Sequence, residues 1–302
     1  MRKVAVCITT YNSAKYLERC INSVLAQSYN DFRLIIVDDG STDDTEEIIR
    51  GFRDERICYK KNPINFGIAA SRNECIKQLE GEEYVFFTDA DCYVDTKWIE
   101  NGLKIYEQDQ KTVCVNGKTV YVSEEYSPHI YENSHIQTDS WSESYQTCNI
   151  SYKRIVFHKL KFDETNFNLV MEDIDFAIMA KQLFPDMKLV STDTMKVTHQ
   201  KKKWTISGFF KDTQKVKYIV NFIKKHGKNN RMFPLAYRGS ILNKEYLLLS
   251  IFPLGIIYYI FKTKKRVSSW LDVIFVFLYV IKSYYYRFLV WKYAIKKKIF
   301  LI

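Results

Sequence analysis

The sequence predicts an α/β protein with a doubly wound, mostly parallel sheet flanked by helices, followed by a helical C-terminal region. Up to residue 92, four apolar runs that fit buried strands alternate with three segments whose apolar residues recur at helical spacing. Such alternation is typical of parallel sheets with right-handed crossovers. The fourth run also ends in two carboxylates, Asp89 and Asp91, and ligands of such sheets gather at the carboxyl ends of strands.

The first strand is expected at Val4 to Thr9, and Asn12 or Ser13 can cap the helix that follows. Apolar residues at helical spacing define the inward face of this helix, namely Leu17, Ile21, Val24 and Leu25. Together the strand and the helix begin a βαβ unit.

Two further strand–helix pairs follow. Arg33 to Val37 predicts the second strand, and Ser41 or Thr42 can cap a helix whose first turn is acidic, with Asp43, Asp44, Glu46 and Glu47. Ile57 to Lys61 predicts a weaker third strand, and Ile68 to Leu79 predicts the helix after it.

The run from Tyr84 to Cys92, YVFFTDADC, predicts a buried strand with an acidic end. Alternate residues of an extended chain point the same way, so Asp89 and Asp91 can both bind one hard cation that carries a diphosphate. The pattern D-x-D alone also fits a solvated turn with acidic capping residues.

The next hundred residues are expected to complete the domain. Trp98 to Tyr106 predicts a helix, Val113 to Val122 a half-exposed strand, and Lys188 to Ser191 and Met195 to His199 two short strands. The polar and aromatic segment from Ser123 to Ser144 predicts a long loop, either a functional lid that faces a variable substrate or plain surface.

A second acidic cluster, Glu172, Asp173 and Asp175, begins the segment MEDIDFAIMAKQLF. This segment predicts a helix whose buried side is formed by Ile174, Ile178 and Leu183. Carboxylates in a first helical turn stabilise the helix dipole, and we interpret Asp175 in this way.

Charge divides the chain into an acidic front and a basic rear. Residues 1 to 200 contain 23 Lys and Arg against 32 Asp and Glu, whereas residues 201 to 302 contain 22 against 3. We expect one domain at residues 1–215 and a membrane-associating tail at residues 216–302, because a basic tail suits an anionic surface.

The tail contains two apolar runs, Tyr246 to Phe261 and Trp270 to Trp291. The first is shorter than the roughly 20 apolar residues of a spanning helix, and charged residues interrupt the second. We therefore expect attachment in the plane of the membrane, with a short two-span hairpin and a soluble helical extension as alternatives. Long apolar runs fit lipid better than nucleic acid, which is not expected as a partner.

The seven cysteines are scattered through the acidic front without a C-x-x-C pair. This pattern is typical of reduced core thiols rather than a disulfide framework or a zinc site. The N-terminal apolar run is too short for a signal peptide, so the domain is expected at the cytoplasmic face of the cell membrane.

Five motifs, in this order, resemble the inverting, nucleotide-sugar-dependent glycosyltransferases of family 2, which have the GT-A fold. They lie within residues 1 to about 215 and read TTYN at Thr9, VDDGSTDDT, NFGIAASRN, FTDAD and MEDIDF. Each motif alone is weak, whereas the five at these separations are specific.

The resemblance implies roles for individual residues. Thr9 and Asp39 would contact the nucleotide base, Tyr11 would pack on it, and Arg72 would lie near the ribose or phosphates. Asp89 and Asp91 match the D-x-D element, which binds the nucleotide diphosphate through Mg²⁺ or Mn²⁺, with Asp91 as the direct metal ligand.

Asp173 matches the general base of the family, which would deprotonate the acceptor hydroxyl as it attacks the anomeric carbon with inversion. His199 lies where related enzymes often carry a histidine near the metal, and a structural role is its alternative. The segment QKKKW at residues 200–204 has Lys203 where processive synthases have Arg, so processive synthesis is not expected.

The predicted function is therefore transfer of a sugar from a nucleotide-sugar donor to a glycan or lipid-linked acceptor. A polyprenyl-phosphate sugar synthase is the alternative within this chemistry. Nucleotidyl transfer would use a Gly-rich phosphate loop after the first strand, where this chain has TTYNSAKY. A non-enzymatic protein that binds membranes or nucleic acid through the basic tail is the alternative of a different class.

Overall fold

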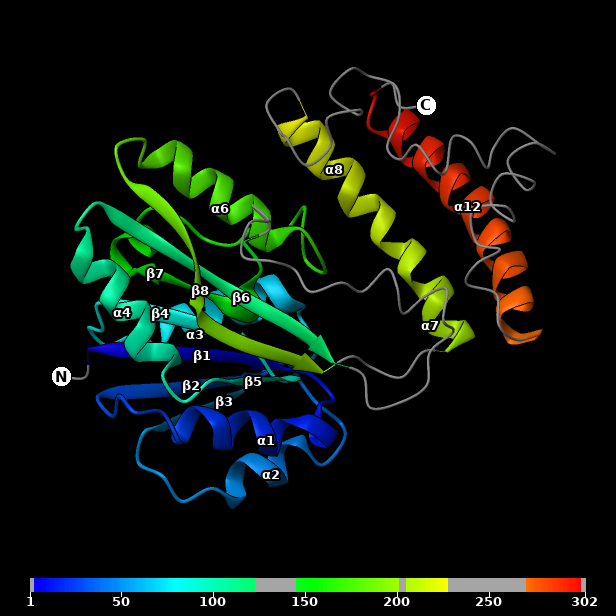
Figure 1. The fold of residues 1–302 in the computed structure, drawn as a ribbon. Coiled ribbons are helices and arrows are strands. Elements are labelled where there is room, and N and C mark those ends of the chain that lie inside the picture. The colour runs from blue at the N-terminus through cyan, green and yellow to red at the C-terminus, as the bar shows by residue number, and fades with distance from the viewer. Residues whose placement is uncertain (1–2, 123–144, 201–204, 228–269, 300–302) are drawn as a thin grey trace. The chain divides into compact units, whose positions relative to one another are not determined.

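A computed structural model of the protein describes residues 3–122, 145–200, 205–227 and 270–299 (Figure 1). These residues form two compact units, one up to residue 200 and a second from residue 205 onward. The first unit thus ends before residue 215, and the division into a transferase domain at 1–215 and a tail at 216–302 stays a prediction. The predicted lid, residues 123–144, and the apolar run 246–261 lie outside the described residues.

The first unit has one mixed sheet with helices on both faces (Figure 1). Its strands are β1 (Val4–Thr10), β2 (Phe32–Asp38), β3 (Ile57–Lys61), β4 (Tyr84–Asp89), β5 (Cys92–Val94), β6 (Thr112–Val122), β7 (Ile150–Lys153) and β8 (Lys188–Gln200). Its helices are α1 (Ala14–Leu25), α2 (Thr45–Gly51), α3 (Ile68–Lys77), α4 (Trp98–Gln108) and α6 (Glu172–Leu183), with 3₁₀ turns η1 (Thr147–Asn149) and η2 (Arg154–His158). The strand order is β3-β2-β1-β4-β7-β6-β8-β5.

The predicted fold class is confirmed. Strands β3, β2, β1 and β4 are parallel neighbours, and helices cover both of their faces. Val4, Val6 and Ile8 of β1 pack toward α1, α2 and α4, whereas Ala5 and Cys7 pack toward α3 and α6. Burial on both faces explains why these strands are continuous apolar runs rather than alternating ones.

Beyond β4 the sheet becomes mixed. β7 is antiparallel to β4 and β6, and β5 is antiparallel to β8. The two short strands expected between Lys188 and His199 are one strand, β8, whose pairing with β6 shifts register near Gly117. A Cβ at Gly117 would lie 2.3 Å from the Met195 carbonyl oxygen, so glycine permits this close approach.

Three further expectations were wrong in detail. The N-cap of the acidic helix is Asp44 rather than Ser41 or Thr42, and the helix begins at Thr45, whose amide and hydroxyl donate hydrogen bonds to the Asp43 carboxylate. The strand expected to be half exposed, β6, is buried from Thr112 to Gly117 because α4 packs on one of its faces and α6 on the other, and it is mostly half-buried from Lys118 to Val122. Leu183 of α6 is 41% exposed, and the helix packs through Phe176 and Ala180 instead.

All seven cysteines are free, and all except Cys58 are buried, as expected for core thiols. Cys92 is 2% exposed and belongs to the core cluster on the α1 side of the sheet.

The second unit contains α7 (Ile206–Lys211), η3 (Asp212–Lys215), α8 (Val216–His226) and α12 (Trp270–Lys296). Within the described part of the chain, one helical segment, Ile274–Lys296, is long and apolar enough to cross a membrane by length and composition. The apolar C-terminal helix agrees with the predicted membrane-associating tail.

Candidate active site

The carboxyl ends of β2, β1 and β4 bring the predicted nucleotide-binding residues to one edge of the sheet. In the parallel register Thr9 lies beside Asp89 on one side and Val37 on the other. The Asp39 amide donates to the Thr10 carbonyl oxygen at 2.8 Å, which holds the end of β2 against the end of β1. The parallel pairing thus gathers Thr9, Asp39 and Asp89, as the sequence predicted.

Tyr11 lies at the same edge and is 46% exposed. The residue after it, Asn12, has a left-handed φ of 48° and ties the two neighbouring loops together. Its amide donates to the Ser41 hydroxyl at 2.9 Å, and its side-chain oxygen accepts from the Thr42 amide at 2.8 Å. These bonds fix the backbone on both sides of Tyr11 and leave its ring open to a flat ligand.

The Asp39 carboxylate is buried and organises the turn before α3. Its Oδ1 accepts from the Asn62 side-chain amide at 2.9 Å and from the Phe66 amide at 3.0 Å, and its Oδ2 accepts from the Gly67 amide at 2.8 Å. Gly67 has a φ of 97°, and a Cβ there would lie 2.1 Å from the Asn168 side-chain oxygen. The sequence did not predict this structural role of Asp39. Its Oδ2 still has a lone pair that can accept a hydrogen bond from another donor.

Arg72 links the two acidic motifs that the sequence places about 80 residues apart. Its guanidinium is 2% exposed, forms a short ion pair with Glu172, and lies 3.3 Å from Asp89 Oδ1. The end of β4 and the start of α6 are therefore joined through one buried cation. No role for Glu172 was predicted from the sequence. Its position directly before Asp173 was the signal that could have indicated one.

Asp173 is the second residue of α6, and Met171, the residue before the helix, has a left-handed φ of 74°. Its pKa is raised to about 7, mainly because burial disfavours the charged form and secondly because Glu172 is negative, whereas Arg72 opposes the shift. A carboxylate that titrates near neutrality suits proton transfer at physiological pH.

Asp91 and His199 meet at the junction of β5 and β8. His199 Nε2 lies 3.5 Å from Asp91 Oδ1, and the Gln200 amide donates to the Asp91 carbonyl oxygen at 2.8 Å. Cys92 pairs in register with His199, and single donor atoms of Asp91, Cys92 and His199 all lie within 4.8 Å of one another. The oxygen and imidazole donors fit Mn²⁺ or a similar divalent cation.

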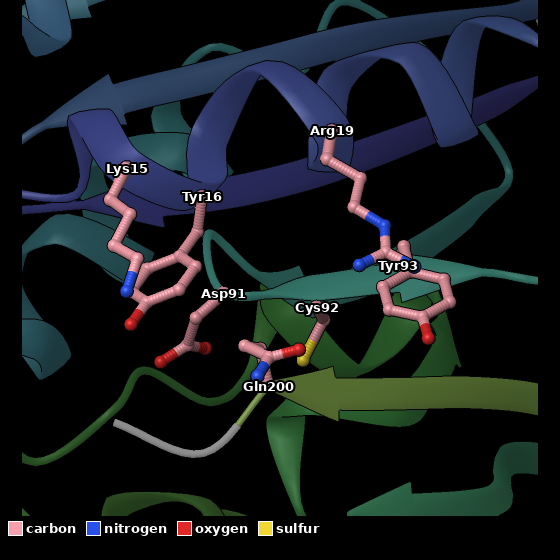
Figure 2. A pocket seen from close by; sticks show the side chains of 7 residues that line it. All are labelled: Lys15, Tyr16, Arg19, Asp91, Cys92, Tyr93 and Gln200. Carbon is pink, nitrogen blue, oxygen red and sulfur yellow. The ribbon is translucent and has the colours of Figure 1, made fainter. Parts of the chain in front are cut away.

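A cavity of about 200 Å³ adjoins Asp91 (Figure 2). It is lined by Lys15, Tyr16, Arg19, Asp91, Cys92, Tyr93 and Gln200. Figure 2 shows the ends of Lys15 and Tyr16 from α1 facing the same space as the Asp91 carboxylate. The Arg19 guanidinium lies 3.6 Å from the centre of the Tyr93 ring. Lys15 and Arg19 were not identified from the sequence as part of the site, because both fit the polar side of an ordinary amphipathic helix.

The sequence profile described as Glycosyl transferase family 2 matches residues 5–187, more than half of the chain. The chain belongs to glycosyl transferase family 2. The matched residues of this family 2 enzyme include Thr9, Asp39, Arg72, Asp91 and Asp173, whereas His199 lies beyond the match.

Two curated relatives of this family 2 chain are glycosyltransferases. Glycosyltransferase GlyA of Streptococcus pneumoniae is 28% identical over 181 residues, which are 53% of this chain and 26% of that protein. The UDP-Glc:alpha-D-GlcNAc-diphosphoundecaprenol beta-1,3-glucosyltransferase WfaP of Escherichia coli is 26% identical over 252 residues, 80% of this chain and 95% of that one. The chain thus spans about a quarter of the first relative and nearly all of the second.

Solved structures share the GT-A fold of this family 2 chain. TarS residues 1–349 of S. aureus with UDP-GlcNAc has a TM-score of 0.55 at 16% identity, covering 94% of this chain and 91% of that one. The mannosyltransferase PcManGT from Pyrobaculum calidifontis with GDP-Man and Mn²⁺ has a TM-score of 0.60 at 17% identity, covering 97% and 84%.

Proposed function

We propose that this family 2 enzyme transfers a sugar from a nucleotide-sugar donor to a glycan or lipid-linked acceptor, with inversion at the anomeric carbon. The observation that carries the proposal is the buried Arg72, which joins Asp89 to Glu172 and acts electrostatically, as Asp89 does, on the neighbouring Asp173. An inverting displacement needs a base and a leaving-group site close together, and this ion-pair network supports such an arrangement.

In this proposal the edge formed by β2, β1 and β4 binds the nucleotide. Tyr11 packs against the base, Thr9 and Asp39 hydrogen-bond to it, and Arg72 and Asp89 lie toward the ribose and phosphates. Tyr11 is exposed and fixed at its backbone by Asn12, which supports stacking on a flat base. The supporting observation for Asp39 is the acceptor capacity left at its Oδ2.

Asp91 and His199 would hold Mg²⁺ or Mn²⁺. When bound, the cation offsets the negative charge that develops on the departing nucleoside diphosphate. Lys15 and Arg19 line the cavity beside Asp91, and their positive charge suits a phosphate group of either substrate. Lys15 and Arg19 would thus provide positive charge where an anionic phosphate group binds.

Asp173 would take the proton of the acceptor hydroxyl as its oxygen attacks. The raised pKa makes its carboxylate a stronger base than an ordinary aspartate, while Arg72 keeps part of the population ionised near pH 7. The proton passes to a carboxyl group that burial already stabilises in the neutral form.

The acceptor is proposed to carry phosphate and to be held at the cytoplasmic face of the membrane. WfaP is named for a diphosphoundecaprenol-linked acceptor, and another relative, TarS of Staphylococcus aureus, 31% identical over 131 residues, is named as a poly(ribitol-phosphate) beta-N-acetylglucosaminyltransferase. Both names describe phosphate-bearing acceptors, which fits the cations beside Asp91 and the apolar C-terminal helix.

A thermal-shift screen with UDP-Glc, UDP-GlcNAc and GDP-Man, each with and without Mn²⁺, tests the donor half of the proposal. A donor that binds the native state raises the melting temperature. The true donor is expected to do so more strongly with Mn²⁺, and incubation with polyprenyl-linked acceptors then gives a product whose anomeric configuration tests inversion. Transfer onto polyprenyl phosphate itself would identify a polyprenyl-phosphate sugar synthase, and absence of any donor-dependent shift would contradict the proposal.

A further inference from the structure

The C-terminal helix α12 carries apolar side chains on two opposite faces. One face is buried, with exposures of 2 to 8%, and contains Phe275, Val276, Val280, Leu289, Val290 and Ala294. The other face, here called the exposed stripe, has exposures of 38 to 77% and contains Ile274, Phe277, Ile281, Tyr284, Tyr285, Phe288, Trp291 and Ile295. A continuous exposed face of this size usually marks an interaction surface.

The buried face of α12 is covered along most of its length by the other helices of the second unit. Phe209 of α7 packs against Phe275, Val276 and Val280. Farther along, α8 packs against Leu289, Val290 and Ala294 through Val216, Val220 and Ile223. The helix is therefore one side of a helical layer rather than an isolated rod.

This packing conflicts with a transmembrane orientation. The outward side of α8 and of the preceding 3₁₀ turn carries exposed lysines, namely Lys215, Lys217, Lys224 and Lys225. Lys282, near the middle of α12, is buried and lies 3.9 Å from Asp212 of η3. If α12 crossed a bilayer with its packing intact, these charges would enter the hydrocarbon, where charged side chains are strongly disfavoured.

Basic residues flank the exposed stripe on both sides. At about 100° per residue, the exposed Lys292 and Lys296 lie about 50° and about 90° from the centre of the stripe on one side, and the half-buried Arg287 lies about 90° from it on the other. The Arg287 guanidinium lies 5.2 Å from the centre of the Trp291 ring within the stripe. An apolar and aromatic face bordered by cations is typical of helices that lie in a lipid interface.

We propose that α12 lies in the plane of an anionic lipid surface, with the exposed stripe inserted among the acyl chains and Arg287, Lys292 and Lys296 among the headgroups. Charge favours this occupant, because residues 201–302 contain 22 basic and 3 acidic residues. This inference rests on the proposed function, in which the acceptor lies at the membrane, and it specifies how the chain attaches there. Flotation and protease accessibility require no glycosyl transfer, so this inference and the proposed function can fail separately.

The test is flotation of the full-length protein with phosphatidylcholine vesicles that contain or lack phosphatidylglycerol. The wild type should float with the anionic vesicles. The triple variant Phe277→Ser/Ile281→Ser/Phe288→Ser should bind at least about tenfold more weakly, because it removes apolar area from the inserted face. A matched variant, Ile155→Ser/Leu183→Ser/Ile206→Ser, loses three exposed apolar residues outside the stripe and should float like the wild type.

Orientation is tested with a C-terminal epitope tag in inverted membrane vesicles from expressing cells. External protease should remove the tag completely if α12 lies in the plane, and a protected tag would overturn that placement. Equal flotation of the stripe variant and the wild type, at equal melting temperatures, would overturn the role of the stripe. A change in the oligomeric state of the stripe variant in detergent-free solution would assign the stripe to a second copy of the chain instead.

Discussion

The two acidic motifs at the sheet edge share an arrangement that their sequences do not show. In each, one carboxylate pairs with the buried Arg72: Asp89 from the end of β4 and Glu172 from the start of α6. The neighbouring carboxylate makes other contacts, Asp91 with His199 and Asp173 with the amide of Ile174. In the proposed function, the carboxylate paired with Arg72 positions the site in each motif, and the other carboxylate takes part in the chemistry.

The strongest test of this division is Asp173→Asn. It should lower turnover by about 10² to 10⁴, because an amide cannot accept the acceptor proton. Binding of the nucleotide sugar, followed by thermal shift, should survive because Arg72 keeps Asp89 and Glu172 in place. Wild-type turnover in this variant would show that Asp173 is not the base.

Glu172→Gln tests the positioning half of the same motif. Removing one partner of a buried ion pair leaves an uncompensated charge, so we expect the free energy of unfolding to fall by about 3 kcal/mol, with Asp89 retaining part of the pairing. The control is Glu46→Gln, which removes an exposed partner of Arg50 and Lys61 and should change the melting temperature little. Equal melting temperatures for the two variants would contradict a structural role for Glu172.

Asp91→Asn tests the chemical half of the D-x-D motif. The variant should lose most of the additional thermal shift that Mn²⁺ gives with the donor, which for a ligand at about 100 times its Kd corresponds to about 2.7 kcal/mol. Asp109→Asn, which alters an exposed carboxylate paired with Lys188, should keep the full Mn²⁺ response. If Asp91→Asn also kept it, the metal would have to bind elsewhere.

A further test is a pH dependence of stability that arises from Asp173. Its pKa is raised from the ordinary value of 3.8 to about 7 in the folded protein, so between these pH values the folded state holds a proton that the unfolded state has released. This contribution to stability is present below about pH 4 and is lost as the pH rises toward 7. Melting temperatures of the wild type and Asp173→Asn should therefore diverge between pH 4 and pH 8, with the variant relatively more stable at pH 8. If the melting temperatures of the two proteins changed with pH in parallel, the raised pKa could not belong to Asp173.

The second unit differs from the first in the kind of side chain that it exposes. At the sheet edge, charged groups are buried and paired, whereas α12 exposes large apolar side chains and keeps Lys282 inside. The ion pairs of Arg72 join the end of β4 to the start of α6 within the chain. In the inference above, the exposed stripe instead gains stability from contact with an anionic lipid surface.

The sequence by itself determined the alternating strands and helices of the first half and the positions of the acidic motifs. It could do so because a buried strand and an amphipathic helix each leave a local pattern, and because Asp89 and Asp91 follow directly from the end of a strand. It also indicated the family, through motifs whose order and separation are linear properties of the chain.

Only the tertiary structure decided which carboxylates pair with Arg72. Arg72 and Glu172 are 100 residues apart, and no local pattern records a contact that forms when α3 and α6 pack on the same face of the sheet. The same holds for the Asp39 carboxylate beneath the turn at Gly67 and for the two faces of α12. Hydrophobic periodicity shows that a side chain is apolar or lies on one face, whereas its partner depends on which elements the folded chain brings together.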